Sequence, residues 1–396
     1  MKYFRLNLIL KGGLTAYCLF MLPAMQLNAQ REAKQIGDFK ESISLNEHLR
    51  GAKRTLQYHP DGDEFVCING KNRYTRALYG SHSPFRVETS DRPVFAFYNN
   101  GRGGNISFKI ILRDGTEVAL DRTGYCESRY SAGKRTYYLT DPSWGKGELR
   151  IVVLALADMD GAIWRFSASN MPKGAILRWQ HGGATGKRLS RNGDMGVDPA
   201  DCFELPAEVT DLATGELPLQ KEAYLVRGEV PEQSNARKLY QKAEAASLAL
   251  ASRLKIETPD PYLNTLGGAL VAAADGIWDG QVWLHGAIGW RMPLSGWRAG
   301  YTGDALGWHD RARTHFDAYA ASQVTDVPNT IPHPAQDSTM NLARSEKRWG
   351  TPQYSNGYIC RNPGRNNQMH HYDMNLCYMD ELLWHFNWTG RSEEHT

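Results

Sequence analysis

The chain lacks an excess of charge of either sign, because its 396 residues carry 46 Lys and Arg against 43 Asp and Glu. A balance this close to neutral excludes binding to nucleic acid or to an anionic membrane by bulk charge. Hydrophobic residues make up 41% of the chain, which excludes a mainly disordered protein and suffices for a sizeable core. At about 150 residues per domain, the length fits two or three domains.

Cysteine is scarce, and none of it stands in a CxxC pair or a zinc-ligand pattern. We expect buried free thiols rather than a disulfide framework. After residue 30, no stretch reaches the roughly 18 apolar residues of a membrane span. No pattern indicates a cofactor. The six cysteines are Cys18, Cys67, Cys126, Cys202, Cys360 and Cys377.

The first 29 residues have the layout of a secretory signal peptide. Basic Lys2 and Arg5 precede a mostly apolar stretch, Leu14–Leu22, and the small Ala29 offers a cleavage point. This pattern predicts a signal peptide over residues 1–29 and a secreted or periplasmic protein. The alternatives are a buried hydrophobic segment and a retained anchor.

Residues 38–230 contain many short apolar runs separated by tight-turn residues. Asn69-Gly70 predicts a hairpin between Phe65–Ile68 and Tyr74–Tyr79, and Asp114-Gly115 predicts a second turn between strands. Many short strands at close spacing predict an antiparallel β-sandwich.

The apolar period changes to that of helices near residue 231. Residues 231–257 are expected to form a connecting helix and linker, and residues 325–368 a long loop. Helices are predicted at Tyr262–Ile277 and Thr302–Ser322, and a last one at Asp373–Trp388. The last helix carries an apolar stripe on one face, formed by Leu376, Met379, Leu383 and Phe386.

From residue 258 onward the chain resembles the six-hairpin glycosidases, which have an (α/α)6 barrel. The N-terminal half resembles the uncharacterised sandwich domain that precedes such barrels in large secreted glycan-degrading proteins. The resemblance spans residues 40–390 and implies a glycoside hydrolase that acts on a polysaccharide or oligosaccharide with carboxylate acid–base catalysis, in the inverting manner. It does not identify the acid and the base. The runs that carry it are Thr258–Asn264, Trp278–Gly286, Trp290–Arg298, Gly303–Arg311 and Asp373–Gly390.

Residues 258–390 are expected to form only part of that barrel. They hold at most about seven or eight helices at about 12 residues per helix and 5 per loop, whereas six hairpins need twelve. Residues 391–396 match the translation of a common sequencing adapter, and Arg391 stands where the resemblance leads us to expect Asp. We therefore expect an artefact at 391–396 and an inactive chain; a genuine polar tail is the alternative.

Five of the 11 tryptophans fall within residues 278–308. Indole offers a flat face to the C–H face of a sugar, and Arg and His side chains hydrogen-bond hydroxyl or carboxylate groups. The alternative is that these tryptophans pack helix interfaces. The candidate substrate-binding residues are Trp278, Trp283, His285, Trp290, Arg291, Trp297, Arg298, Trp308, His309, His370, His371 and Asp373.

Glycoside hydrolysis requires two carboxyl groups that flank the scissile bond. Asp279 follows a helix among tryptophans, where desolvation is expected to raise its pKa. Asp380 and Glu381 are further candidates in the middle of a helix, and we expect one of them to lie on an exposed helical face. His370–Asp373 gathers potential metal ligands, but no third ligand is in register, so no metal site is predicted. The general acid can also lie beyond Gly390. The predicted catalytic residues are Asp279, Asp304 and Asp310.

Three other functions stay open: a glycan-binding protein without catalysis, a glycoside phosphorylase and a polysaccharide lyase. Clustered tryptophans suit binding as well as cleavage. Export argues against a phosphorylase, and toroidal lyases generally carry the sandwich after the helices rather than before them. The expected partner is a carbohydrate substrate, and the sequence leaves the oligomeric state open.

Overall fold

A computed structural model groups residues Gln57–Thr396 into one compact unit. The expected signal peptide and residues 391–396 lie outside the described residues. Side chains are described for most of the other positions, with Tyr98, Tyr372, Asp373 and the short strands after residue 329 as exceptions. The structure describes residues 57–71, 76–98, 104–182, 212–219, 221–286, 293, 300–323, 330–332, 336–337, 342–343, 352–354, 357, 359–360, 363 and 372–390.

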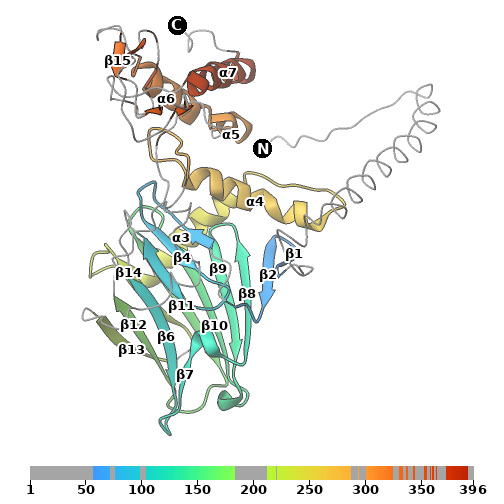
Figure 1. Cartoon of the computed structure of the whole chain (residues 1–396). Helices are drawn as coiled ribbons and strands as arrows, with labels where there is room; N and C mark the ends of the chain where they lie inside the picture. The colour runs from blue at the N-terminus through green and yellow to red at the C-terminus, as the bar shows by residue number, and fades with distance from the viewer. Residues whose placement is uncertain are drawn as a thin grey trace, which may run out of the picture. The chain divides into compact units, whose positions relative to one another are not determined.

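The strands between residues 59 and 228 form two antiparallel sheets of seven strands each (Figure 1). The first sheet, in the order β1-β2-β8-β9-β10-β11-β14, consists of β1 (His59–Asp61), β2 (Glu64–Ile68), β8 (Tyr125–Ser131), β9 (Lys134–Thr140), β10 (Glu148–Ala155), β11 (Gly161–Ser169) and β14 (Ala223–Gly228). The second, in the order β13-β12-β6-β5-β4-β3 with β7 beside β6, consists of β3 (Arg76–Leu78), β4 (Arg86–Thr89), β5 (Phe95–Tyr98), β6 (Asn105–Ile111), β7 (Glu117–Ala119), β12 (Ile176–Gly182) and β13 (Leu212–Pro218).

Side chains from both sheets meet in one hydrophobic core. Phe95 of β5 and Phe108 of β6 pack edge-to-face on Trp164 of β11, with ring centroids 5.5 and 6.0 Å away. Every second residue of β8 is buried, as expected for a strand that turns one face to such a core. The prediction of antiparallel strands in this part of the chain is therefore confirmed.

Strand β10 is apolar on both faces because it is covered on both sides. Ile151 and Val153 face the core between the sheets. Val152 and Leu154 pack instead against helix α3 (Ala236–Ala251). The sequence of a strand that is buried on both faces is a continuous run of apolar residues rather than an alternation of apolar and polar ones.

The hairpin predicted around Asn69-Gly70 is wrong, because the chain changes sheets there. Strand β2 pairs with β1 and β8 of the first sheet, whereas β3 belongs to the second. Asn69 has φ of 50°, donates its N–H to the Cys126 carbonyl at 2.8 Å and accepts the Cys126 N–H on Oδ1 at 2.9 Å. The turn at Asp114-Gly115 does join two paired strands, β6 and β7, as predicted.

The chain after β14 is mainly helical. Helix α4 begins at the predicted place, where Asp260 accepts the Tyr262 N–H at 2.8 Å and Pro261 takes the first helical position. The single helix predicted over Thr302–Ser322 is two helices, because Gly307 adopts φ of 72° between them. No helix in the described part of the chain is both long and apolar enough to cross a membrane. The elements after α3 are α4 (Pro261–Gly276), α5 (Gly300–Ala305), α6 (His309–Ala320), β15 (Thr330–Pro332), β16 (Gln336–Asp337), β17 (Leu342–Ala343), β18 (Pro352–Tyr354) and α7 (Tyr372–Thr389).

Helix α7 turns its most apolar stripe outward. The four residues predicted to share a face do so, but they are 38–64% exposed: Leu376, Met379, Leu383 and Phe386. The opposite, buried side consists of Met374, Tyr378, Glu381 and His385. Two ionisable side chains therefore point inward on this helix.

Arg86 of β4 connects the second sheet to the end of α4. Its buried guanidinium donates to the carbonyl oxygens of Gly276, Phe85 and Ser83 at 2.6, 2.6 and 2.7 Å. It also lies 4.7 Å from the ring centroid of Tyr79. A buried charge with this many acceptors stabilises the contact only while all of its hydrogen bonds are made.

We expect R86L to lower the free energy of unfolding by about 2–4 kcal/mol, because it leaves buried carbonyl oxygens without a donor. Urea unfolding followed by tryptophan fluorescence measures the change. R178L is the matched control, since Arg178 is exposed and pairs only with exposed carboxylates; it should change the value by less than about 0.5 kcal/mol. Equal losses in the two variants would contradict the role of Arg86.

Candidate active site

The tryptophan-rich segment after α4 folds into a loop that Asp279 stabilises. Asp279 Oδ1 accepts the N–H groups of Gln281 and Val282 at 2.9 and 2.7 Å. Trp278 and Trp283 then pair as an isolated antiparallel bridge, with ring centroids 4.8 Å apart. Asp279 is exposed, so the desolvation expected for it among the tryptophans does not occur. Its carboxylate holds a turn.

Trp278, Trp283 and Trp308 belong to the hydrophobic core of the helical part. A buried indole does not offer its face to a sugar, so the structure gives these three residues the packing role that the sequence left as the alternative. Arg311 covers Trp308, with its guanidinium 4.4 Å from the indole, and donates to Asp275 at 2.7 Å. The predicted binding residue His285 follows this loop and is half-buried.

A second cluster of polar groups lies where α4 meets the strands. Asp275 accepts hydrogen bonds from Arg311 at 2.7 Å and from His82 at 3.3 Å. A cavity of about 210 Å³ adjoins them and is lined for the rest mainly by alanine and other small or apolar side chains. Because these polar groups are bonded to one another, the cluster stabilises the junction rather than marking a reaction site.

Trp283 sets the position of helix α5. A Cβ atom on Gly303 would lie 2.3 Å from Cη2 of Trp283, so only glycine allows this approach. The backbone N–H of Trp283 donates to Nδ1 of His315, a buried residue of α6, at 3.1 Å. Because Nδ1 accepts this hydrogen bond, the proton of the His315 ring is on Nε2. Burial lowers the pKa of His315 to about 3, so the ring is neutral. The loop, α5 and α6 are thereby tied together next to Asp304.

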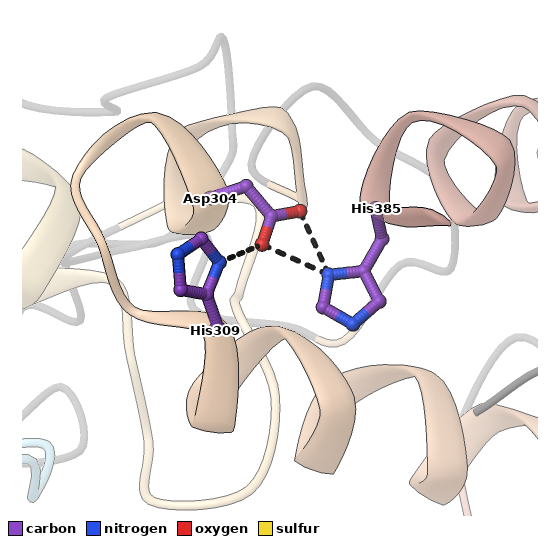
Figure 2. A group of neighbouring side chains, drawn as sticks. All are labelled: Asp304, His309 and His385. Carbon is purple, nitrogen blue, oxygen red and sulfur yellow. Dashed lines mark hydrogen bonds and ion pairs between the residues drawn. The ribbon is translucent and has the colours of Figure 1, made fainter. Parts of the chain in front are cut away.

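Asp304 of α5 lies between two histidines, one at the start of α6 and one on α7 (Figure 2). Nδ1 of His309 is 2.7 Å from Oδ1, and Nδ1 of His385 is 2.8 and 2.9 Å from the two carboxylate oxygens. The side chains of Asp304 and His385 are 4% and 1% exposed, whereas that of His309 is 45% exposed. The cluster therefore reaches solvent through His309.

The two imidazoles keep Asp304 ionised. Burial by itself raises the pKa of this carboxyl, but the hydrogen bonds and positive charge of His385 and His309 outweigh it and hold the pKa below its usual range. In return the carboxylate orients each ring through Nδ1, and the second nitrogen of each ring points away from it (Figure 2). A carboxylate that fixes an imidazole in this way is a common element of catalytic sites.

Glu381 is a second buried carboxyl group beside the same helices. It lies on α7 one turn before His385, and its Oε2 is 2.3 Å from where a Cβ atom on Gly300 would be. Gly300 is one turn before Asp304 on α5, so α5 and α7 place the two carboxyl groups on neighbouring helices. Glu381 is 1% exposed, and neither of its oxygens has a hydrogen-bond partner among the residues that the structure describes.

Glu381 and Asp304 are driven towards opposite protonation states. Burial, with a smaller contribution from the neighbouring Asp380, raises the pKa of Glu381 to about 8. Asp380 itself is exposed and accepts the Tyr301 hydroxyl at 2.5 Å. At neutral pH, Glu381 is thus protonated while Asp304 is ionised. Two carboxyl groups with separated pKa values supply a general acid and a general base.

The other predicted site residues lie apart from this pair or outside the described residues. Asp310, on the first turn of α6, has a side chain that is 92% exposed, and Arg313 lies 3.5 Å from it. His309 is the member of the predicted binding set that the structure brings to Asp304. Of Asp373 only the helical backbone is described. The predicted residues outside the described part are Trp290, Arg291, Trp297, Arg298, His370 and His371.

Of the residues at this site, Glu381 is a candidate carboxylate that is not among the predicted catalytic residues, and His385 is absent from the sequence-based candidates. The available signal is their spacing with Met374 and Tyr378, since positions i, i+4, i+7 and i+11 share one helix face. The more apolar stripe on the other side of α7 masks that signal.

Comparisons with known proteins name no activity for this chain. Residues 100–226, less than half of it, match a family described as a domain of unknown function (DUF4450). No curated protein matches. The crystal structure of bacterial glucoamylase complexed with acarbose is similar at 10% identity and a TM-score of 0.40, over 71% of this chain and 53% of that one. The chain thus spans about half the length of that glucoamylase, and a TM-score this low does not establish a common fold.

E381Q is expected to stabilise the protein at neutral pH. Because folding raises the pKa of Glu381 from 4.5 to about 8, its stabilising contribution is complete below pH 4.5 and is lost as the pH rises towards 8. Glutamine has the same shape and stays neutral. The free energy of unfolding should rise by about 3–4 kcal/mol at pH 7.5 and by less than about 0.5 kcal/mol at pH 4.5.

Urea unfolding at the two pH values measures this difference. The control is E232Q, because Glu232 is exposed; it should leave the free energy of unfolding within about 0.5 kcal/mol at both. A gain for E381Q that is the same at pH 4.5 and pH 7.5 would mean that ionisation of Glu381 is not its cause.

Proposed function

We propose that this chain is part of a glycoside hydrolase in which Glu381 is the general acid and Asp304 the general base. The observation that carries the proposal is the pair of buried carboxyl groups on neighbouring helices α5 and α7. Two imidazoles hold one of them, and the other has no hydrogen-bond partner in the described part of the chain. Cleavage of a glycosidic bond requires such a pair, one protonated and one ionised. The exposed Asp279 and Asp310 have no role in this proposal.

In the proposed reaction, Glu381 donates its proton to the oxygen of the leaving sugar as the C–O bond breaks. Asp304 accepts a proton from the water that attacks the anomeric carbon. His309 and His385 hold the carboxylate in place through their Nδ1 atoms. We propose inversion of configuration, which places the carboxyl groups roughly 6.5–9.5 Å apart so that water fits between them; retention places them at about 5 Å.

The proposal extends to the architecture around the site. Helices α4 to α7 are part of an (α/α)6 barrel, and residues 38–230, 231–257 and 258–390 are its sandwich, connecting segment and partial barrel. Residues 1–29 direct export to the periplasm or the exterior, where polysaccharides are found. We propose that the substrate reaches Asp304 from solvent on the side of His309, since His309 is the exposed member of the cluster. Trp290 and Trp297 remain the proposed stacking residues for sugar rings.

The proposal predicts hydrolysis of a polysaccharide that depends on both carboxyl groups. Reducing sugar is measured on a panel of plant, algal and animal polysaccharides, with NMR of the first anomer released. The assay uses this chain and any longer product of the genomic reading frame past residue 390. E381Q and D304N should each lower kcat by about 10²–10⁴-fold, whereas D310N leaves it unchanged. The wild-type rate should fall as the pH rises past 8, because Glu381 loses its proton.

Other products would contradict this function in distinct ways. A sugar phosphate indicates a phosphorylase, an unsaturated uronate indicates a lyase, and retained binding without a product indicates a glycan-binding protein. An unchanged kcat in E381Q would remove Glu381 as the acid, and its expected gain in stability excludes unfolding as the reason for a lost activity.

A further inference from the structure

Asp304, His309 and His385 bring one oxygen and two nitrogen donors to a single point, and their donor atoms all lie within 4.8 Å of one another. We propose that this cluster binds one divalent transition-metal ion of the zinc type. The proposal concerns the three side chains themselves and does not depend on the reaction that the chain performs.

The donor set suits such an ion. Imidazole nitrogen together with carboxylate oxygen favours zinc, cobalt and neighbouring metals over magnesium and calcium, which prefer oxygen donors. Ligands at about 2.0–2.1 Å from a tetrahedral ion lie about 3.3 Å from one another. The N···O distances in the cluster are 2.7–2.9 Å. On binding, the N···O separations widen by about half an ångström, and the two Nδ1 atoms, which lie within 4.8 Å of each other, adjust to a similar separation. Each neutral ring then carries its proton on Nε2.

The backbone holds the three ligands in place before any ion arrives. Asp304 is in the last turn of α5, His309 is the first residue of α6, and the left-handed Gly307 fixes the short turn between them. His385 comes from the long helix α7, where it is fully buried. Ligands on three packed elements lose little conformational freedom when they bind a metal.

The surroundings of the cluster also favour a cation. Glu381 lies one turn before His385 on the same buried face of α7, and its carboxyl oxygens have no hydrogen-bond partner in the described residues. A dication bound nearby would favour the ionised form of that side chain over the neutral form that burial favours. The half-exposed His309 ring supplies a route for the ion, and three protein ligands leave a fourth position for water.

One consequence rests on the proposed function. A metal ion on Asp304 occupies the carboxylate that accepts the proton from water, so it inhibits hydrolysis, and a chelator restores the rate. If Zn²⁺ that the titration shows to be bound leaves the rate unchanged, Asp304 is not the base.

The binding test uses the full chain and no substrate. Chelator-treated protein is titrated with CoCl₂, followed by its visible absorption, and with ZnCl₂, followed by calorimetry. We expect one equivalent to bind, with the intense absorption of tetrahedral Co²⁺ and a higher Tm in the presence of Zn²⁺. H309A and D304N should bind at least tenfold more weakly. H309Q is the gentler variant, because His309 is half-exposed at a helix start.

H82A is the matched control. It removes another histidine–carboxylate contact, that of His82 with Asp275, and should bind within twofold of the wild type. Circular dichroism confirms that each variant is folded. Binding of less than 0.2 equivalents by the folded wild type, or equal affinities in H309Q and H82A, would overturn the metal site. Either result leaves the hydrolase test untouched, and a chain without hydrolase activity leaves the titration valid.

Discussion

One ionised carboxylate, that of Asp304, fixes the arrangement of the last three helices. Asp304 lies on α5, and its carboxylate accepts hydrogen bonds from the first residue of α6 and from His385 near the C-terminal end of α7. Because it is almost fully buried, its charge is tolerated only while both imidazoles face it. The position of α7 is thus tied to Asp304, and with it the position of Glu381.

Glu381 makes this arrangement less stable than its packing alone would allow. Burying a carboxyl group without a hydrogen-bond partner in the described residues favours its neutral form and weakens the folded state at neutral pH. A leucine or glutamine would fit the same helix face without that cost. Strain of this kind persists at positions where a function requires the group, which distinguishes Glu381 from the solvated Asp380 beside it.

The sequence predicts what depends on neighbours along the chain. The turn at Asp114-Gly115 and the helix predicted over Tyr262–Ile277 are local, and both form where the pattern places them, the helix with its bounds shifted by one residue. The prediction of a hairpin at Asn69-Gly70 is wrong because the geometry of this turn depends on Cys126, which is 57 residues away in the sequence. The predicted residues include Asp304 and His309 but not His385, since Asp304 and His385 are 81 residues apart and no spacing rule joins them. On α7, the more apolar stripe is exposed, and the side that carries Glu381 and His385 is buried.

Three of the tryptophans that suggested a carbohydrate site from the sequence lie in the hydrophobic core beside Asp304. Trp283 is buried, contacts Gly303 too closely for any side chain, and donates to His315. Gly303 immediately precedes Asp304, so the indole sets how far α5 can approach the loop. A larger residue at Gly303 would push Asp304 away from both histidines without changing any charged group. The described indoles of this aromatic cluster therefore support the helices that carry Asp304 and Glu381.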